Sequence, residues 1–222
     1  MAENNIEQAR FNMVEQQIRP WEVLDQTVLT ILSTVPREAF VPDAYRNLAF
    51  ADMEIPLGHG AQMMKPVIEG RLLQALALKP TDKVLEIGTG SGFLTACLAE
   101  LSDQVISVEI QPELAQQASA KLAAQGINNA TVKTGDALPT ASIYGSFDAI
   151  AVTGSLPQAE AADALKAQLN VGGRLFAIIG EGVVMEARLI TRTGKNQWSS
   201  EALFESELPP LANTSTASSF QF

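Results

Sequence analysis

The sequence predicts an α/β fold in which five parallel strands form a doubly wound sheet that ends in an antiparallel hairpin. From residue 83 onwards, apolar runs of strand length alternate with helical stretches, the pattern of parallel strands joined by helical crossovers. Residues 186–205 instead read as two strands around a turn at 194–196. The 222 residues, 46% hydrophobic and 18% charged, suit one domain with a large core.

Residues 1–78 are expected to form a helical cap and a substrate loop within this single domain. Apolar spacing predicts a first helix over 6–18 that ends before Pro20, because the residue preceding a proline avoids the α conformation. Asp25 is a candidate N-cap for a second helix, which Pro36 should close. The sequence further predicts a short element at 37–42, a loop at 55–66 and a helix over 67–78.

Residues 79–212 are expected to form the sheet and the ligand-binding core. Apolar runs predict strands at 83–87, 104–108, 130–133, 147–152 and 174–179. Helices are predicted between them at about 91–101, 112–125 and 157–168. The hairpin strands 186–193 and 198–205 follow, and a polar tail, 213–222, ends in Phe220-Gln-Phe222.

A glycine-rich loop follows the first of these strands. Its alternate glycines let the backbone approach a ligand closely, but the dinucleotide fingerprint is excluded because its third glycine would fall on Phe93. Glu86 would repel a pyrophosphate, whereas it could accept hydrogen bonds from an ammonium group. We therefore expect a nucleotide-like ligand with an amino group. The residues expected to bind it here are Glu86, Gly88, Thr89, Gly90, Ser91 and Gly92.

Two more acidic residues follow the next two strands. Glu109 stands 21 residues after Gly88, the position from which a carboxylate binds both hydroxyls of a ribose. Asp136 follows the third strand, where an adenine amino group would lie in such a site. Because ribose, adenine and a charged amino acid end together describe S-adenosylmethionine, the sequence predicts this cofactor.

Composition argues against several classes of partner. Acidic residues outnumber basic ones 25 to 15 and no run of Lys or Arg occurs, which disfavours nucleic acid and an anionic membrane surface. No stretch reaches 18 apolar residues, and the first 25 residues lack the apolar core of a secretory signal. We therefore expect a cytoplasmic protein, and a monomer.

Other catalytic chemistries find no support in the sequence. No His, Cys and acid cluster offers a metal site, and Gly92 directly after Ser91 breaks the Gly-x-Ser-x-Gly pattern of serine hydrolases. His59, the single histidine, is expected to be solvated or bonded to backbone. Cys97, the single cysteine, is expected to pack in the core.

The sequence resembles the protein-L-isoaspartate O-methyltransferase family over most of its length. The resembling segments are 35–41, 55–60, 84–93, 135–136, 147–153 and 169–174. The resemblance implies a Rossmann-like, seven-stranded methyltransferase sheet, with S-adenosylmethionine bound by the loop residues, Glu109 and Asp136. It also implies methylation of the carboxylate of isoaspartyl residues in damaged proteins, which begins their repair.

The loop at 55–66 departs from the family pattern. The family typically continues with Gln-Thr-Ile-Ser-x-Pro, whose hydroxyls lie near the methyl acceptor, but the hydroxyl positions are Gln62 and Met64 here. Thr153 and Ser155, after the fourth strand, could substitute. The acceptor-side catalytic candidates are thus Gln62, Met64 and Ser155. The chemistry remains feasible, because a carboxylate is already an anionic nucleophile and positioning does most of the work.

Two alternatives remain open at this stage. The first is a methyltransferase of the same family that acts on another carboxylate or on a small molecule. Met64 suits an apolar acceptor, although packing against the sheet is the favoured interpretation of the Met63-Met64 pair. The second is a non-catalytic module that binds the cofactor and contacts a partner through the tail at 220–222.

Overall fold

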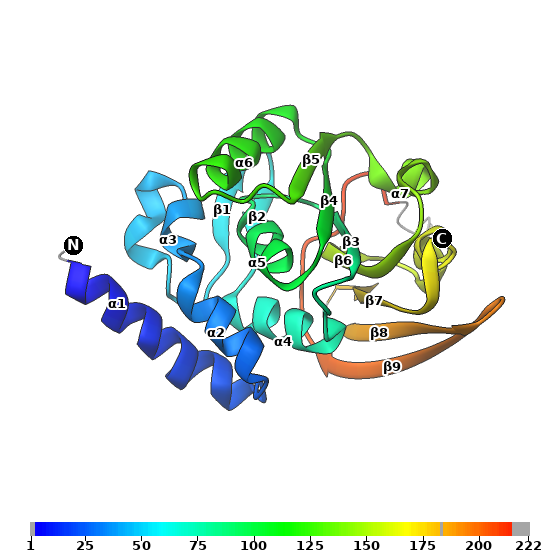
Figure 1. Cartoon of the computed structure of the whole chain (residues 1–222), viewed down its shortest axis with the longest axis horizontal. Helices are drawn as coiled ribbons and strands as arrows, with labels where there is room; N and C mark the ends of the chain where they lie inside the picture. Colours follow the sequence, from blue (N-terminus) through cyan, green and yellow to red (C-terminus); the bar gives the residue numbers. More distant parts are fainter. Residues whose placement is uncertain (1–2, 183, 215–222) are drawn as a thin grey trace, which may run out of the picture.

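A computed structural model describes residues 3–182 and 184–214 of the chain (Figure 1). A seven-stranded sheet with the order β5-β4-β3-β6-β7-β8-β9 forms its centre. These strands are β3 (Lys83–Ile87), β4 (Gln104–Glu109), β5 (Ala130–Thr134), β6 (Phe147–Leu156), β7 (Leu169–Glu181), β8 (Val184–Gly194) and β9 (Gln197–Glu205). The first five are parallel, and β8 and β9 continue the sheet antiparallel. The predicted fold class is confirmed.

Helices cover both faces of the sheet. They are α1 (Glu3–Asn12), η1 (Met13–Ile18), η2 (Arg19–Trp21), α2 (Gln26–Thr34), α3 (Arg37–Phe40), η3 (Asp43–Leu48), α4 (Pro66–Leu76), α5 (Phe93–Leu101), α6 (Pro112–Ala124), α7 (Ala137–Thr140), η4 (Ala141–Tyr144), η5 (Ala159–Ala162) and α8 (Asp163–Lys166). One hydrophobic cluster joins the sheet to α4, α5 and the N-terminal cap, and a second joins it to α7 and α8. The central strands are buried on both sides, which explains their continuous apolar runs.

The N-terminal helix runs further than the sequence predicted. It continues from α1 through the π-helical η1 into the 3-10 turn η2, so it does not end before Pro20. Pro20 stands at the start of the 3-10 turn, a position that suits the fixed φ of proline. Phe11 belongs to the apolar spacing that predicts this helix with one buried face, but its side chain is 59% exposed. The wider π turn rotates the residues after Asn12 relative to those before it.

The second predicted helix is confirmed with its cap. Asp25 Oδ1 accepts hydrogen bonds from the backbone N–H groups of Thr27 (2.8 Å) and Val28 (3.1 Å), which satisfies two of the free donors of α2. The helix ends at Thr34, and its C-cap, Val35, directly precedes Pro36, as expected. Within the described chain, no helix is long and apolar enough to cross a membrane.

Two segments differ from the predictions. The expected loop at 55–66 contains a small antiparallel hairpin, β1 (Ile55–Gly58) and β2 (Ala61–Met63), which turns at His59 and Gly60. Both turn residues have positive φ, 54° and 76°. The helix predicted over 157–168 is instead divided between the short helices η5 and α8.

Candidate functional site

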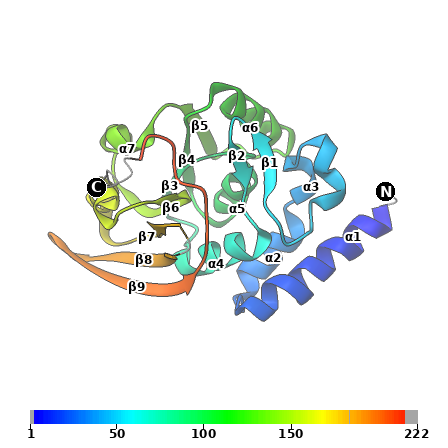
Figure 2. The same cartoon turned by 180° about the vertical axis from the view of Figure 1, so that it is seen from behind.

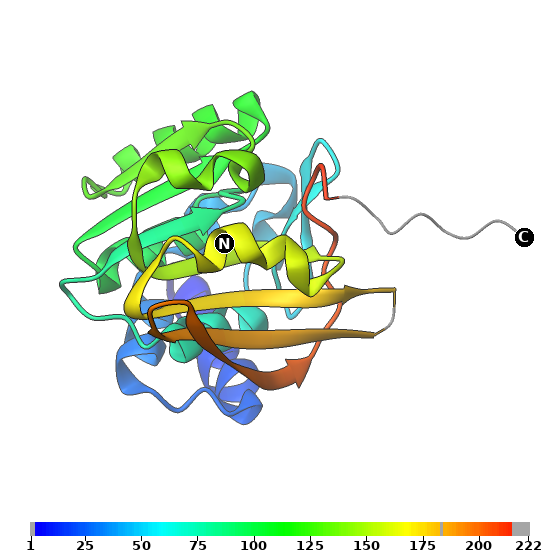
Figure 3. The same ribbon diagram turned by 90° about the vertical axis from the view of Figure 1, so that its right-hand side faces the viewer.

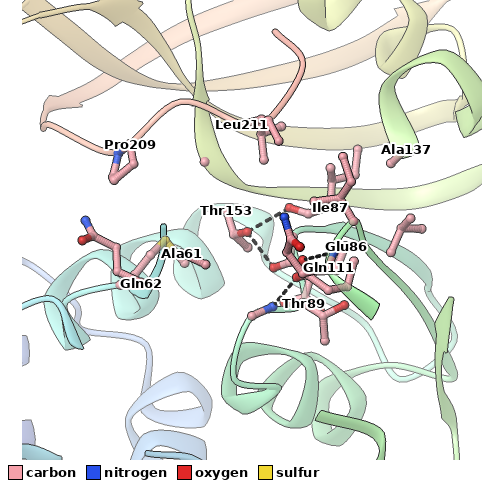
Figure 4. Close-up of a pocket in the computed structure, with 18 of the residues that line it drawn as sticks. Ala61, Gln62, Glu86, Ile87, Thr89, Gln111, Ala137, Thr153, Pro209 and Leu211 are labelled. Atoms are coloured by element: carbon pink, nitrogen blue, oxygen red, sulfur yellow. Dashed lines mark hydrogen bonds between the residues drawn. The ribbon is translucent and has the colours of Figure 1, made fainter. Parts of the chain in front are cut away.

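A cavity of about 220 Å³ lies at the carboxyl ends of the central parallel strands (Figure 4). This edge is where open α/β sheets bind their ligands. The cavity is lined by residues 59–64, 86–91, 108–111, 135–138, 153–154 and 208–212, together with Glu69 and Leu94. The cavity therefore joins the glycine loop, the acidic strand ends and the β1–β2 hairpin in one site.

The glycine loop adopts the backbone conformation for which glycine is suited. Gly88, Gly90 and Gly92 have φ of 92°, 52° and 87°, a region that other residues rarely enter. A Cβ atom on Gly88 would lie only 2.2 Å from the hydroxyl oxygen of Thr153. That hydroxyl donates to the carbonyls of Ile87 (2.9 Å) and Gly88 (2.7 Å), so it fixes the loop. Thr153 is thus committed to the loop and is not a spare acceptor-side hydroxyl.

Glu86 is fully buried beneath this loop. Its Oε2 accepts hydrogen bonds from Thr95 Oγ1 (2.5 Å) and Ser107 Oγ (2.6 Å), whereas its Oε1 has no partner among the described residues. Burial raises the pKa of Glu86 to about 8 against the effect of these two hydroxyls, and the nearby charges of Glu109 and Glu69 raise it further. A carboxylate with an unpartnered buried oxygen is suited to receive a cationic donor.

The other two predicted acids also line the cavity. Glu109 accepts hydrogen bonds from the backbone N–H of Gly90 at Oε2 (2.8 Å) and of Gln111 at Oε1 (3.0 Å). Asp136 Oδ1 accepts from the N–H of Leu138 (3.2 Å), and its Oδ2 accepts from the side-chain amide of Asn213 (2.9 Å). The structure therefore brings Glu86, Glu109 and Asp136 into one cavity, as their places after successive strands predicted.

The two loop hydroxyls also line the cavity but are engaged locally. Thr89 Oγ1 lies 2.5 Å from Ser107 Oγ, and Ser91 Oγ accepts from the backbone N–H of Phe93 (3.2 Å) at the start of α5. Both residues are buried. Their hydroxyls hold the loop and the helix start in place.

The β1–β2 hairpin forms the opposite wall. Gln62 Nε2 donates to Glu54 Oε2 (2.5 Å), and the buried Met64 accepts a hydrogen bond at its backbone oxygen from Arg37 (2.7 Å). At the tip of the hairpin, His59 Nε2 lies 3.5 Å from Glu113 Oε2 on α6. Gln62, Met64 and His59 all line the cavity.

Ser155 is placed differently from the other acceptor-side candidates. It is 1% exposed, its Oγ has no partner among the described residues, and it is absent from the cavity lining of the described chain. A C-terminal segment, residues 206–212, covers it, and we call this segment the strap. The N–H of Ser155 donates to the carbonyl of Pro209 (2.8 Å), and its carbonyl accepts from the N–H of Leu211 (3.0 Å). Sequence reasoning could not foresee this cover.

The strap returns from β9 to the middle of the sheet (Figures 2 and 3). It passes above the glycine loop, and Pro209 faces Gln62 of the hairpin across the cavity (Figure 4). Gly154 permits this path, because a Cβ atom there would lie 2.8 Å from Leu211 Cδ2 and 3.1 Å from its backbone nitrogen. Residues of the strap and of the hairpin therefore form two walls of the cavity.

Replacing Gly154 with Ala is expected to displace the strap, since the new methyl group overlaps Leu211. Limited proteolysis should cleave the C-terminal segment faster than in the wild type. Adding Leu211→Ala should partly restore protection, because it removes the side-chain overlap. Equal cleavage of the wild type and the Gly154→Ala variant would contradict this account of the strap.

A buried ion pair that the sequence analysis did not single out adjoins the cavity. Arg37 is fully buried and pairs through Nη1 with Glu69 Oε2. Its other donors bind the carbonyls of Ala49 (2.8 Å) and Met64 (2.7 Å), and its guanidinium lies 4.8 Å from the centre of the Phe93 ring. Arg37 thus links the N-terminal cap to the hairpin and to α5.

Glu69 is the member of this pair that lines the cavity. Burial raises its pKa to about 7, and the charge of Arg37 opposes the rise. The sequence analysis did not identify Glu69, because a glutamate in the first turn of a helix is usually exposed to solvent. Its spacing could have identified it as buried: Glu69 precedes Leu72, Leu73 and Leu76 by three, four and seven residues, which puts it on the buried face of α4.

No group of three or more His, Cys, Asp or Glu residues that could hold a metal ion occurs in residues 3–182 and 184–214. Cys97 is buried as expected. The site therefore consists of carboxylates, hydroxyls and backbone amides around an open cavity.

Comparisons with known proteins agree with this geometry. The sequence profile of the family described as protein-L-isoaspartate(D-aspartate) O-methyltransferase matches residues 8–215. The chain is similar to the protein-L-isoaspartate O-methyltransferase of a Picosynechococcus species, with 43% identity over 77% of this chain and 76% of the relative. It is also similar to protein-L-isoaspartate O-methyltransferase 1 of Rhodopseudomonas palustris, with 38% identity over 91% and 82%.

A solved structure shares the fold. A candidate protein-L-isoaspartate O-methyltransferase of Plasmodium falciparum, in complex with S-adenosyl-L-homocysteine, superposes with a TM-score of 0.77. The two sequences are 22% identical, and the match covers 93% of this chain and 97% of the other. The seven-stranded arrangement with its helical cap is therefore shared over nearly the whole chain.

Proposed function

Because this chain belongs to the protein-L-isoaspartate(D-aspartate) O-methyltransferase family, we propose that it transfers a methyl group from S-adenosylmethionine to the carboxylate of isoaspartyl residues in proteins. The observation that carries the proposal is the cavity at the strand ends. It combines the glycine loop with Glu86, whose buried Oε1 has no partner among the described residues, and with Glu109 and Asp136. The hairpin and the strap enclose the same cavity on the acceptor side.

The residues present fit the parts of the cofactor. Glu86 would hold the ammonium group, and Glu109 would hold the ribose hydroxyls. Asp136 would hold the adenine amino group, and the hydrogen bond that its Oδ2 accepts from the amide of Asn213 supports this assignment. When bound, the cofactor supplies a methyl group on a positively charged sulfur, which an anionic acceptor can attack directly.

The acceptor side of the site has to orient a carboxylate, not deprotonate it. A carboxylate is ionised at neutral pH, so His59 is not required as a base. We propose that Gln62 offers an amide donor to the acceptor and that Met64 shapes the wall beside it. Ser155 would take part only if the strap moves, because the strap covers it.

Replacing Met64 with Ser is expected to raise kcat/KM on an isoaspartyl peptide. A hydroxyl returned to the family position would strengthen acceptor binding in the transition state by about 1–3 kcal/mol, or about 5- to 150-fold in rate. Met63→Ser is the matched control, because it removes a neighbouring buried methionine without restoring that hydroxyl. A gain that is equal in both variants, or absent from Met64→Ser, would contradict the proposed orientation of the loop.

A second acceptor class is the alternative within the same family. Gln62 and Met64 replace both hydroxyls of the family loop, which favours an acceptor other than an isoaspartyl carboxylate, such as another carboxylate or a small molecule. Screening these acceptors with labelled cofactor would distinguish the two, since only the first proposal requires a base-labile methyl ester on the isoaspartyl peptide.

The proposal also includes the setting of the activity. We propose protein repair in the cytoplasm by a monomer that binds no nucleic acid or membrane surface. The excess of 25 acidic over 15 basic residues supports the lack of polyanionic partners. The non-catalytic alternative depends on the tail at 220–222, which lies outside the described residues. Calorimetry with S-adenosylmethionine tests the cofactor site, and absence of binding would contradict all of these proposals.

A further inference from the structure

A groove on the sheet surface lies apart from the cavity at the strand ends, beside α8. Its volume is about 400 Å³, and it is lined by Ala159, Lys166, Ile179, Arg188, Ile190, Trp198, Ser199 and Ser200. None of these described residues lines the cavity at the strand ends. We call it the β8 groove, because residues of β8 and of its two neighbours in the sheet, β7 and β9, form most of its lining.

The groove arises because the helices on this face do not reach the edge of the sheet. η5 and α8 pack on β6 and β7, whereas β8 and β9 extend beyond them (Figure 3). Along β8, Arg188 and Ile190 line the groove, whereas Ala187 and Leu189 pack in the hydrophobic cluster of the opposite face. The strand therefore places one basic and one apolar side chain on the face that the helices leave uncovered.

The β8 groove is basic, although the chain is acidic overall. Residues 187–200 contain Arg188, Arg192 and Lys195 and no acidic residue, whereas the whole chain has 25 acidic and 15 basic residues. Lys166 adds a further positive charge from α8. The charge of this surface is thus opposite in sign to that of the whole chain, and it complements an acidic partner.

The two cations that line the groove have partners at the surface. Lys166 Nζ lies 2.5 Å from Asp163 Oδ1, and Arg188 Nη2 lies 2.7 Å from Glu186 Oε2. The side chains of these carboxylates are 63% and 38% exposed, and ion pairs so open to solvent are weak. Both cations can therefore bind an incoming carboxylate without leaving a charge buried and unpaired.

Trp198 gives the groove a fixed aromatic surface. It is 38% exposed, and its indole N–H donates to the carbonyl of Lys166 (3.2 Å). The guanidinium of Arg192 lies 5.9 Å from the centre of its ring. An exposed Trp beside Arg side chains is the combination that most often dominates the binding energy of protein interfaces.

The length of the groove suits an extended chain. Trp198 pairs with Arg192 across the ladder, so Trp198 and Arg188 stand four residues apart along the strands. At the rise of an antiparallel strand this is roughly 14 Å, the length of about four residues of extended polypeptide. One cation, Arg188, lies toward one end of this span, and Lys166 lies beside Trp198 at the other.

We propose that the β8 groove is a docking site for an acidic polypeptide segment that carries an apolar side chain. The apolar side chain packs on Trp198, and carboxylates on either side of it bind Lys166 and Arg188. A nucleic acid strand fits less well, because its phosphates would continue beyond the groove over a chain with a net charge of −10. The groove is separate from the cavity, so this proposal does not depend on the proposed function.

Fluorescence anisotropy of a labelled peptide tests the docking site with the full chain. The probe carries a Leu-Phe pair flanked on both sides by glutamates. One reference peptide replaces the glutamates with glutamines, and the other replaces the Leu-Phe pair with serines. We expect the probe to bind at low salt with a Kd of about 10–100 μM, and each reference peptide to bind at least about fivefold more weakly.

Variants of the groove identify the residues that carry this binding. Trp198→Ala is expected to weaken binding of the probe by at least about 10-fold, and Arg188→Gln and Lys166→Gln by about 2- to 5-fold each. Trp21→Ala and Lys133→Gln are the matched controls. Trp21 is 44% exposed, and Lys133 is exposed on β5, the strand at the opposite edge of the sheet. Neither control should change the affinity.

Absence of probe binding below about 1 mM would overturn the docking site, as would equal affinity for the probe and the glutamine peptide. Equal losses in Trp198→Ala and Trp21→Ala would place the binding outside the groove. If Trp198→Ala does not fold, Arg188→Glu reverses the charge at a partly exposed position, and an unchanged affinity would again overturn the proposal. Tighter binding of a single-stranded oligonucleotide than of the probe would contradict a polypeptide partner.

Discussion

Arg37→Ala is expected to lower the free energy of unfolding by about 3–5 kcal/mol, the cost of leaving a buried charge without its partner. Glu69 would lose its counter-ion, and the carbonyls of Ala49 and Met64 would lose their donors. Packing on Phe93 would also be lost. Because the guanidinium links the cap, the hairpin and α5, this one substitution should loosen the acceptor wall of the cavity as well as the fold.

Urea unfolding would measure this effect, with Arg46→Ala as the control. Arg46 is 56% exposed and pairs with Asp43 on the surface at 3.2 Å. Such a pair contributes at most about 1 kcal/mol, so the control should remain close to the wild type. Similar losses of unfolding free energy in the two variants would contradict the proposed role of Arg37 in holding the N-terminal cap in place.

Glu86→Gln is expected to stabilise the cofactor-free protein while it weakens cofactor binding. The pKa of Glu86 is raised from 4.5 to about 8 in the folded state. Ionisation of Glu86 therefore does not lower the stability of the fold below the unfolded pKa, and lowers it progressively as the pH rises to 8. The variant lacks this penalty. The stability advantage of the variant over the wild type should be small at pH 4, below both pKa values, and on the order of 4 kcal/mol at pH 8.

The same substitution should reduce affinity for S-adenosylhomocysteine by about 100-fold, since the ammonium group loses its charged partner. Wild-type affinity should rise as pH approaches 8, because binding favours ionised Glu86. The charged groups that act on the pKa of Glu86 are Glu109 and Glu69, and Arg37 acts on that of Glu69. Unfolding measured at both pH values and calorimetry would check these effects. A stability difference that does not change with pH would contradict the role of Glu86.

Residues whose role follows from strand order could be predicted from the sequence. Glu86, Glu109 and Asp136 each stand at or after the end of a parallel strand, and parallel strands end at a common edge. Their convergence on one cavity therefore depends only on the fold class. The positive φ values of the glycine loop follow in the same way from the residue type.

Residues placed by tertiary packing could not be predicted in this way. Ser155 stands at the same strand edge, but the strap returns from β9 to cover it, and nothing local in the sequence indicates that path. The burial of Glu69 in an ion pair could not be predicted, because its partner, Arg37, is 32 residues away in the sequence. The substrate loop was recognised as a segment, whereas its β1–β2 hairpin depends on a turn in which a histidine adopts positive φ.

The departure of the substrate loop from the family pattern is the central chemical question. By the resemblance in sequence, the buried Met64 and the amide of Gln62 would occupy the places of two hydroxyls. Chemistry at a carboxylate does not require either hydroxyl, because the acceptor is already anionic and orientation can come from other donors. The family fold and the cofactor cavity are therefore compatible with isoaspartyl methylation by a differently built acceptor wall.

The most direct test is transfer of a labelled methyl group from S-adenosylmethionine to an isoaspartyl peptide, beside the same peptide with a normal aspartyl residue. We predict a base-labile methyl ester on the isoaspartyl peptide and none on its aspartyl counterpart. Clear cofactor binding without ester on either peptide would contradict the proposed acceptor, and equal esterification of both would contradict its specificity.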